Sequence, residues 1–508
     1  MRLNHDYLEE REEVMKKNGN HYPSVILAQV DSKPAFCRFR DRLLPYIKNV
    51  NEAHLVMLSE QGIVKQSDAG KIMRAIEKID YSVYPGMEYS GEFEDLYFQM
   101  EKQIIDMSGG AGGNLHLGRS RNDMSMTWSR LGVRKHLISL IEKLIHFQNT
   151  VRLFAETHKS TVYVIHTHTQ HAQPGLLGHY FLGFTDVIDR CIGRFCFAYD
   201  ATNQSPMGAA AATTTGFPIS RDRVCELLGF DKTIECSYDA IGNFDHFFTA
   251  ASAISLCALD LGRTITDLLL WSTEEEKMII LADGYSSTSS IMPQKRNPIA
   301  LEHLRGSLSL IKGLADTVHT AFLKCPYGDV SDHEDVEDTL DAAFTKLEES
   351  IELFNAVLAT TEVNKELLEK RAYESFSTVT ELADEMVRAC GVPFRKAHGF
   401  VSHMVKKAER QNFNLKNITE DFFTEAYEEY FDSSFDMAFA PFHNCLDPLR
   451  FIYVRDIPGG TGPTAMENLL RSALQKVQTN ETWLEQKKTG IRMADKKLSD
   501  EIEKIVKY

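Results

Sequence analysis

Apolar residues repeat at alternating steps of three and four positions in five long stretches of the chain. The stretches run from Val133 to Phe154, Leu177 to Phe195, Ile254 to Leu268, Leu301 to Phe322 and Leu340 to Leu358. Such repeats are typical of long helices packed at shallow angles in a bundle. No alternating strand pattern of comparable length occurs, so we expect an all-α fold. Helices this long bury more than one face, which predicts that other copies of the chain complete the bundle.

Glycine and proline clusters divide the chain into three parts. A charged amphipathic pattern over Glu92–Met107 ends in the cluster Ser108–Gly113, a strong helix stop and a candidate domain boundary. After about residue 370 the helical patterns shorten, and from about Thr482 alternating charges predict a solvated helical tail. We therefore predict an N-terminal helical domain (1–117), a central long-helix bundle (118–370) and a small C-terminal helical domain with a charged tail (371–508).

Composition narrows the class of protein. The 508 residues are 43% apolar and 25% charged, as is ordinary for a soluble globular protein. The formal charge of −16 argues against nucleic acid as a partner. No apolar run reaches the length of a membrane span, and residues 1–20 show no secretory signal. Nine cysteines without a C-x-x-C pair fit reduced thiols in a cytoplasmic protein better than a disulfide framework.

The stretch Gly113–Asp123 concentrates polar side chains just before the first long helix. It reads GNLHLGRSRND, with two arginines, a serine, an asparagine and a histidine around a glycine-flanked turn. Asp123 or Asn122 can cap the helix. The uncapped backbone amides at the helix start, together with the guanidinium donors of the arginines, suit a carboxylate or phosphate. A helix start with a surface ion pair explains this stretch, taken alone, at least as well.

Three histidines follow in His166–Pro174, at His166, His168 and His171. Their spacing suggests a metal site, because an extended chain would put His166 and His168 on one face. No carboxylate or thiolate ligand lies nearby, and Ala172-Gln173-Pro174 is expected to introduce a helix, so a transition metal is disfavoured. A neutral histidine in acid–base or leaving-group chemistry is favoured, with a core role for His166 and His171 as the alternative.

The segment Gly284–Asn297, GYSSTSSIMPQKRN, is too polar to bury a core face, yet it lies between two apolar elements. Loops of this kind often carry binding and catalysis. A solvated connection is the commoner role, but Lys295 and Asn297 at fixed offsets argue against it. Asn297 is a natural N-cap for a helix that carries Glu302 on its first turns, and the Lys295 ammonium beside that helix start offers a second anion clamp.

Taken together, these stretches resemble the aspartase/fumarase superfamily and, within it, the argininosuccinate lyases. The run from Ser289 to Asn297 is similar to the superfamily signature loop, and Gly113–Asp123 and Thr167–Pro174 are similar to that branch specifically. The similarity extends from about residue 45 to 478. It implies a three-domain all-α fold whose central bundles form a twenty-helix core in a homotetramer, with active sites shared between subunits.

The resemblance also implies the chemistry: reversible anti β-elimination from an N-substituted aspartate, giving fumarate and an amine or guanidine, without metal or organic cofactor. Removing a proton beside a carboxylate requires concentrated positive charge. By resemblance Ser289 is the base, Lys295 stabilises its alkoxide, and His168, oriented by Glu302, serves the leaving group. The expected substrate-binding residues are His116, Ser120, Arg121, Asn122, Thr167, Gln170, Ser290, Met292, Asn297, Tyr327 and Asp332. Within the family, this activity belongs to amino-acid metabolism and arginine biosynthesis.

The chain departs from its relatives where they bind the leaving group. Tyr327 is kept, but Asp332 and Asp335 stand where the family's Gln and Lys hold the amino-acid end of arginine. Two acids there would repel a carboxylate. Gly242–Asp245 also replaces a Ser-Asp/Glu-Arg-Asp run, and the segment before Tyr46 lacks a clear match to the family's substrate-binding Ser and Asp.

Three alternatives to argininosuccinate cleavage therefore remain open. The first is a lyase for another amino-substituted succinate, whose leaving amine has a cationic far end or lacks a carboxylate. The second is an adenylosuccinate lyase, which the Gly113–Asp123 stretch disfavours. The third is a non-catalytic structural relative, against which the retention of Ser289, Lys295 and His168 argues.

Overall fold

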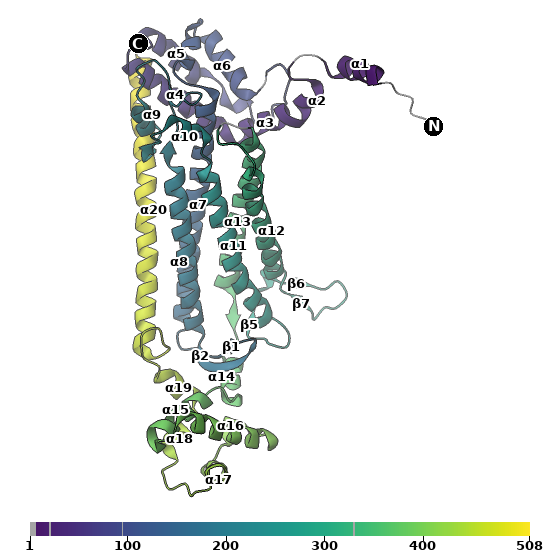
Figure 1. Cartoon of the computed structure of the whole chain (residues 1–508), viewed down its shortest axis with the longest axis vertical. Helices are drawn as coiled ribbons and strands as arrows, with labels where there is room; N and C mark the ends of the chain where they lie inside the picture. The colour runs from purple at the N-terminus through teal and green to yellow at the C-terminus, as the bar shows by residue number, and fades with distance from the viewer. Residues whose placement is uncertain (1–6, 20–21, 94, 329–330) are drawn as a thin grey trace.

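The structure is a computed structural model that describes residues 7–19, 22–93, 95–328 and 331–508. It is elongated, with a helical N-terminal region at one end, a bundle of long helices in the middle and small helices at the other end (Figure 1). No helix within the described ranges combines the length and apolar content that crossing a bilayer requires.

The middle of the molecule is the predicted bundle. Each of the five apolar repeats falls in a long helix, and their seam residues form one continuous buried core. The prediction of long packed helices is confirmed. The helices are α7 (Arg121–Thr157), α8 (Leu177–Thr202), α11 (Asp245–Trp271), α12 (Ile299–Phe322) and α13 (Asp332–Thr360).

The N-terminal region has a separate apolar core that also receives residues of the last helix. The helix predicted over Glu92–Met107 begins later, at Leu96, because the Asp95 side chain caps it by accepting a hydrogen bond from the Phe98 amide at 3.1 Å. The elements here are α1 (Tyr7–Asn18), α2 (Val25–Leu27), η1 (Ala28–Ser32), α3 (Lys33–Arg38), η2 (Phe39–Leu43), α4 (Leu44–Glu60), α5 (Gln66–Lys78), η3 (Tyr81–Val83), α6 (Leu96–Met107), η4 (Ala111–His116), α9 (Arg221–Leu227) and α10 (Ser237–Gly242).

Short helices pack around a third apolar core at the opposite end. They are α15 (Val379–Cys390), α16 (Phe394–Arg410), η6 (Leu415–Asn417), α17 (Glu420–Phe431) and α18 (Ala440–Asn444). Two further short helices, α14 (Lys365–Glu374) and α19 (Pro448–Tyr453), contribute Leu368, Ala372 and Ile452 to the core of the bundle instead. Although the described residues form separate large apolar cores in the middle and at the two ends, the domain boundaries after residues 117 and 370 stay a prediction.

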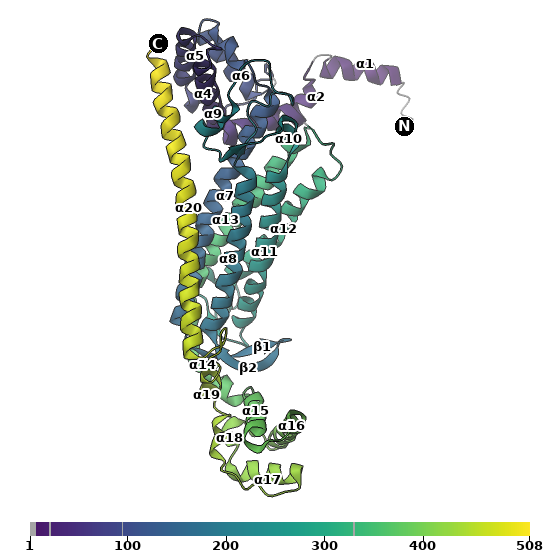
Figure 2. The same ribbon diagram turned by 60° about the vertical axis from the view of Figure 1, so that its left-hand side comes forward.

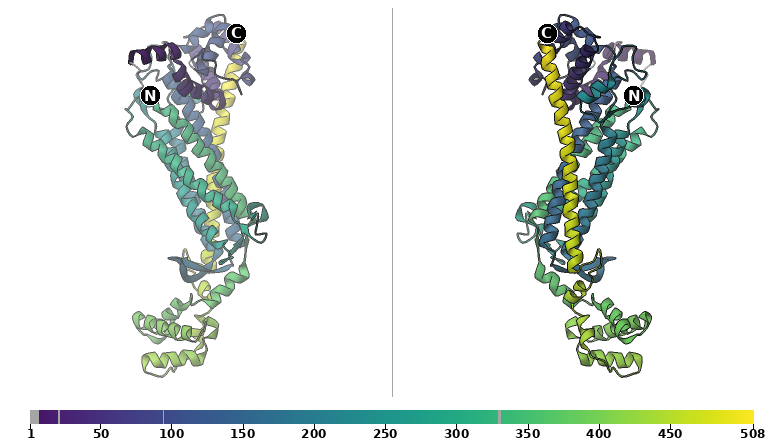
Figure 3. Two further views of the ribbon diagram at one scale, coloured as in Figure 1. Left: turned by 90° about the vertical axis from the view of Figure 1, so that its right-hand side faces the viewer. Right: turned by 90° about the vertical axis from the view of Figure 1, so that its left-hand side faces the viewer.

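The last helix, α20 (Pro463–Val506), runs along one side of the bundle back to the N-terminal region (Figure 3). Leu484, Leu498 and Ile505 are buried on it. The prediction of a solvated tail from about Thr482 was therefore wrong for one face of this helix, because widely spaced apolar residues between the charges anchor it.

Strands within the described ranges occur only as short pairs. The longest pair is an antiparallel hairpin of β1 (Val162–Thr167) and β2 (Gln170–Leu176). Pro174 lies in β2, near an irregularity between Val164 and His166, and the helix expected after Ala172-Gln173-Pro174 is α8, which begins at Leu177. The other pairs are β3 (Gln204–Ser205) with β4 (Lys232–Thr233), β5 (Ile279–Ile280) with β8 (Glu362–Val363), and β6 (Ser287–Thr288) with β7 (Arg296–Asn297).

Candidate active site

The segments that carry the predicted site residues lie in two groups towards opposite ends of the bundle, with β1 and β2 at its lower end and α10 at its upper end (Figure 2). The Gly113–Asp123 stretch precedes the upper end of α7, and Tyr327 follows the upper end of α12. The β1–β2 hairpin and the β6–β7 loop lie towards the lower end. Because α7 has 37 residues and rises about 1.5 Å per residue, the ends are about 55 Å apart. One chain therefore does not bring all the predicted residues together.

At the upper end, Ser120 caps α7. Its Oγ accepts from the Asn122 amide at 3.4 Å, while the Ser120 amide donates to Asp123 Oδ1 at 2.9 Å, which completes a capping box. The expectations that Asn122 or Asp123 caps this helix, and that its amides are uncapped, were therefore wrong. Asp123 is buried and also accepts from the amides of Gly208 and Ala210, both at 2.9 Å. Burial raises the pKa of Asp123 to about 6 despite these hydrogen bonds.

The buried Arg119 and the partly exposed Arg121 lie next to this cap and keep unused donors. The Arg121 guanidinium forms an ion pair with Asp95 and lies 4.9 Å from the Tyr97 ring centroid and 5.0 Å from that of Trp128. Arg119 Nη2 donates to Tyr97 Oη at 3.3 Å. Among the described residues, Nε and Nη1 of Arg119 and Nη1 of Arg121 have no hydrogen-bond acceptor. Since unsatisfied buried donors are costly, these groups can receive an anionic ligand.

His116 lies beside the same ring. Its Nδ1 is 3.2 Å from Glu101 Oε1 and 3.1 Å from Tyr97 Oη. The hydrogen bond to His116 lowers the pKa of Glu101. Sequence reasoning missed Tyr97 and Asp95, since their spacing fits an ordinary core aromatic residue and a helix cap.

Tyr327, also at the upper end, is anchored from α10. Its hydroxyl donates to Asp239 Oδ1 at 2.8 Å, and its carbonyl accepts from the Tyr238 hydroxyl at 2.8 Å. The hydrogen bond to Asp239 raises the pKa of Tyr327 to about 12, so the phenol stays protonated at neutral pH. Asp332 and Asp335 fall in the first turn of α13, and their side chains lie outside the described part of the structure.

At the lower end, His168 stands at the tip of the β1–β2 hairpin. Thr167 pairs with Gln170, and the two turn residues His168 and Thr169 have φ of 51° and 60°, as a tight type I′ turn requires. The strand ends at Thr167, so the extended chain that would put His166 and His168 on one face does not form. The turn exposes the His168 imidazole, while the rings of His166 and His171 meet edge to face at 5.0 Å across the strands.

The Ser289 hydroxyl is held in the loop between β6 and β7. Its Oγ accepts hydrogen bonds from the amides of Ile291 and Met292, at 3.3 and 3.1 Å. Amides that point at this oxygen favour a negative charge on it. Ser290, Met292 and Lys295 are exposed.

Asn297 belongs to β7, where its Nδ2 donates to Ser287 Oγ at 3.4 Å. The expectation that Asn297 caps α12 was therefore wrong: the N-cap position is Pro298, with no side-chain cap. Glu302 lies in the first turn of α12, as predicted, and its carboxylate is exposed.

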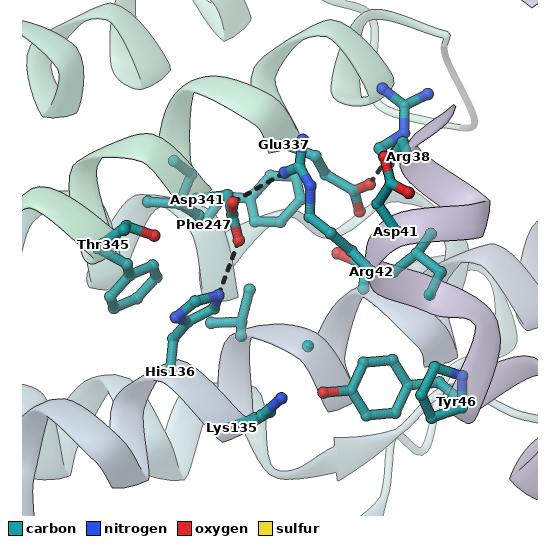
Figure 4. A pocket seen from close by; sticks show the side chains of 17 residues that line it. Arg38, Asp41, Arg42, Tyr46, Lys135, His136, Phe247, Glu337, Asp341 and Thr345 are labelled. Atoms are coloured by element: carbon teal, nitrogen blue, oxygen red, sulfur yellow. Dashed lines mark hydrogen bonds and ion pairs between the residues drawn. The ribbon is translucent and has the colours of Figure 1, made fainter. Parts of the chain in front are cut away.

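A cavity of about 360 Å³ between η2, α7 and α13 contains none of the predicted residues (Figure 4). Arg42 contacts Asp338 at 2.7 Å and Asp341 at 3.0 Å. His136 Nε2 lies 2.7 Å from Asp341, and its Nδ1 lies 3.4 Å from Glu348. The pairs of Arg42 with Asp338 and Asp341 join the N-terminal segment to α13, and His136 joins α7 to the same helix.

Two family models match the chain. A model described as "Lyase" covers residues 60–313, and one described as "Argininosuccinate lyase C-terminal" covers residues 376–446. The argininosuccinate lyase of Methanococcus maripaludis is 33% identical over 447 residues, or 88% of this chain and 92% of its own length. That of Methanococcoides burtonii is 34% identical over 462 residues, or 90% of this chain and 92% of its own length.

Solved structures show the same architecture. An EDDS lyase in complex with formate superposes with a TM-score of 0.83 at 28% identity, over 92% of this chain and 93% of its own. A class II fumarase from Schistosoma mansoni has a TM-score of 0.65 at 17% identity, over 80% of this chain and 90% of its own, which shows the fold alone. The all-α aspartase/fumarase fold is thereby confirmed.

Proposed function

Because the chain belongs to the argininosuccinate lyase family of the aspartase/fumarase superfamily, we propose that it cleaves an N-substituted aspartate by reversible anti β-elimination with Ser289 as base. Membership makes it a carbon–nitrogen lyase that releases fumarate. The observation that carries the proposal is the Ser289 hydroxyl, with two backbone amides already directed at its oxygen.

Ser289 takes the proton from the carbon next to the substrate carboxylate. A serine hydroxyl is a weak acid in water, so its alkoxide needs donors and positive charge close by. The amides of Ile291 and Met292 supply the donors, and the Lys295 ammonium supplies the charge when the exposed loop closes over substrate. The same lysine and Asn297 hold the succinyl carboxylate whose charge grows as the proton leaves.

The leaving group departs on the side of His168. A protonated imidazole at the hairpin tip can pass its proton to the leaving nitrogen, directly or through water, and becomes neutral as it does so. Glu302 orients that imidazole. Ser120, Arg121, Asn122 and Thr167 bind the two carboxylates, and the unused donors of Arg119 and Arg121 support an anion at the upper end of α7.

Both ends of the bundle must meet for this chemistry, so we propose a homotetramer with active sites formed between subunits and a twenty-helix core. Two features support it. The predicted residues of one chain form two groups towards opposite ends of a bundle whose longest central helix, α7, spans about 55 Å. Apolar side chains are also exposed along the bundle, including Leu256 and Leu259 of α11 and Leu310 of α12, which a second copy would cover.

A second candidate is elimination from an aspartate whose leaving amine is not arginine. It is favoured by Asp332 and Asp335 at the positions where relatives bind the arginine carboxylate, and by the structural likeness to an EDDS lyase. Under this candidate the role in arginine biosynthesis does not apply, while Ser289, Lys295 and Asn297 keep their roles on the succinyl half.

The test is fumarate release, followed by ultraviolet absorbance, with argininosuccinate and other N-substituted aspartates. Ser289→Ala should lower kcat by about 10³-fold, since that is the scale of a general base, while substrate affinity measured by calorimetry stays close to wild type. Ser309→Ala, in the middle of α12, is the matched control. Near-normal kcat in Ser289→Ala would refute the assignment, and no fumarate from any substrate would favour a non-catalytic relative.

A further inference from the structure

A second cavity, of about 350 Å³, lies between α4, α7, the end of α9 and the last helix, α20. It contains none of the predicted site residues. Its lining combines leucine and isoleucine side chains with polar and charged ones. The lining residues are Tyr46, Asn49, Leu131, Arg134, Lys135, Ile138, Leu227, Leu228, Lys488, Ile491, Arg492, Asp495 and Leu498.

The charges of this lining are mostly positive: among the described residues, four cations share the cavity with a single carboxylate, Asp495. The two cations of α20 have partners outside the cavity, since Lys488 lies 2.6 Å from Glu142 and Arg492 pairs with Glu485. The net positive charge is therefore left by the two cations of α7 against Asp495.

Arg134, on α7, is only 8% exposed and is held through one of its nitrogens. Its Nη1 donates to Asn203 Oδ1 at 2.9 Å and to the carbonyls of Leu228 and Gly229, at 3.0 and 2.9 Å. Its Nε and Nη2 donate to no described residue, and neither is fully enclosed. The guanidinium is thus fixed in place with one edge open to a ligand.

The open edge of Arg134 has the geometry that holds a carboxylate elsewhere in this chain. Arg40 donates from Nε and Nη2 to the two oxygens of Asp41, at 2.6 and 2.7 Å. Arg223 holds Glu60 through the same two nitrogens, at 2.8 and 2.7 Å. Such a pair of parallel donors suits a carboxylate or a phosphate.

Three further donors of the lining are unused. The Lys135 ammonium, the Tyr46 hydroxyl and the Asn49 amide form no hydrogen bond or ion pair with a described residue. The side-chain ends of Lys135 and Tyr46 point toward one another (Figure 4). Asp495 does not neutralise this group: burial raises its pKa, and the nearby Arg134 lowers that pKa only in part.

We propose that this cavity binds a small anion that has a carboxylate or phosphate head and an apolar body. The open edge of Arg134 and the Lys135 ammonium hold the head, and the leucines and isoleucines cover the body. Because the ligand touches α4, α7 and α20 at once, it clamps the last helix to the bundle. The site lies outside the predicted active site and does not depend on the proposed elimination.

The experiment measures binding to the full chain by calorimetry at pH 7, with phenyl phosphate, benzoate and benzylamine. The three probes share a ring and differ in the charged head. At least one of the two anions should bind at one molecule per chain, about tenfold or more tighter than benzylamine, and the tighter anion identifies the head. No binding of either anion, or equal binding of benzylamine, overturns the proposal.

Substitutions of opposite sign test where the anion binds. Lys135→Met removes a cation and should weaken the anion by about tenfold, whereas Asp495→Asn removes the repelling acid and should tighten it by about threefold. Both side chains are exposed, so both variants should fold. Arg134→Lys keeps the charge but loses the paired donors, and should also weaken binding about tenfold. A Kd that neither Lys135→Met nor Asp495→Asn changes overturns the placement.

Lys102→Met and Asp106→Asn are the matched controls, since they make the same charge changes in an exposed pair on α6, and each should leave the Kd within about twofold. An equal effect of the controls would show a general charge effect and overturn the site. Amide exchange tests the clamp: the bound anion should slow exchange in residues 488–498 of α20. Unchanged exchange there at saturating anion overturns it.

Discussion

The Arg121 guanidinium is held inside the N-terminal region by charge and by stacking. It pairs with Asp95, which is only 4% exposed, and lies against the rings of Tyr97 and Trp128. Arg121 is also one of the predicted carboxylate ligands. Removing the Arg121 side chain distinguishes the two roles. Loss of a structural role lowers stability, whereas loss of a binding role lowers substrate affinity.

Arg121→Ala should lower the free energy of unfolding by about 3 kcal/mol, because it leaves the Asp95 carboxylate buried without its partner. Urea unfolding measures this. Arg152→Ala, which breaks an i,i+4 pair with the half-exposed Glu156, is the control and should cost about 0.5 kcal/mol. Wild-type stability in Arg121→Ala, together with lost substrate affinity, would show that this arginine acts on substrate alone.

The protonation of His136 makes the free energy of unfolding depend on pH. Burial alone would lower its pKa, but hydrogen bonds to Asp341 and Glu348 raise it to about 9. An unfolded histidine titrates near 6.5, so the charged imidazole stabilises the fold fully below about pH 6.5, and this contribution is lost as pH rises through about 9.

His136→Gln should therefore destabilise the protein most at about pH 6 and least above about pH 9, by at most about 3 kcal/mol. Urea unfolding across that range measures the difference. The same substitution at the exposed His146 of α7 is the control, with an expected effect within about 0.5 kcal/mol at every pH. A difference that grows with pH would contradict the assigned direction.

At the scale of elements, the long helices could be predicted because their apolar seams persist over many turns. The β1–β2 hairpin could not, since its turn is His168-Thr169 rather than the Asn-Gly type that marks such turns in a sequence. The burial of one face of α20 could not be predicted either, because no regular local pattern marks it. Leu484, Leu498 and Ile505 are spread among charged residues, and only the surface of the neighbouring bundle shows that they share a buried face.

The hairpin turn carries strain that can be removed. Thr169 is β-branched and has φ of 60°, a conformation that glycine adopts freely. Thr169→Gly should stabilise the hairpin by about 1 kcal/mol, seen as slower amide exchange in β1 and β2. The same change at the extended, exposed Thr167 should speed exchange. Faster exchange in both variants would mean that the turn is not strained.

At the scale of the whole molecule, the all-α fold class could be predicted from the sequence, and the resemblance implied sites shared between subunits. The site residues themselves stay a prediction, and the contacts that pack the helices together could not be predicted. Tyr327 and Ser289 are only 38 positions apart in the sequence, yet α12, whose 24 residues span about 36 Å, lies between them (Figure 1). The side-chain pairs that fasten the N-terminal segment, such as Arg42 with Asp338, also join residues nearly 300 positions apart. No local pattern encodes such contacts, because they arise from how the helices pack.

Because the two groups of predicted residues lie apart within one chain, mixing two variants can test whether each active site is shared between subunits. If each site takes its upper group from one subunit and its lower group from another, Asn122→Ala and Ser289→Ala damage different subunits of a site. Each variant alone should be inactive, yet mixing them one to one under dissociating conditions and reassembling should restore about one quarter of wild-type activity, by random assortment. Fumarate release measures the recovered activity.

Ser289→Ala mixed with Lys295→Ala is the control: both changes lie in the same loop, so every site keeps one defect and stays inactive. No recovery in the first mixture, with reassembly verified by mass in solution, would mean that the site is built within one chain.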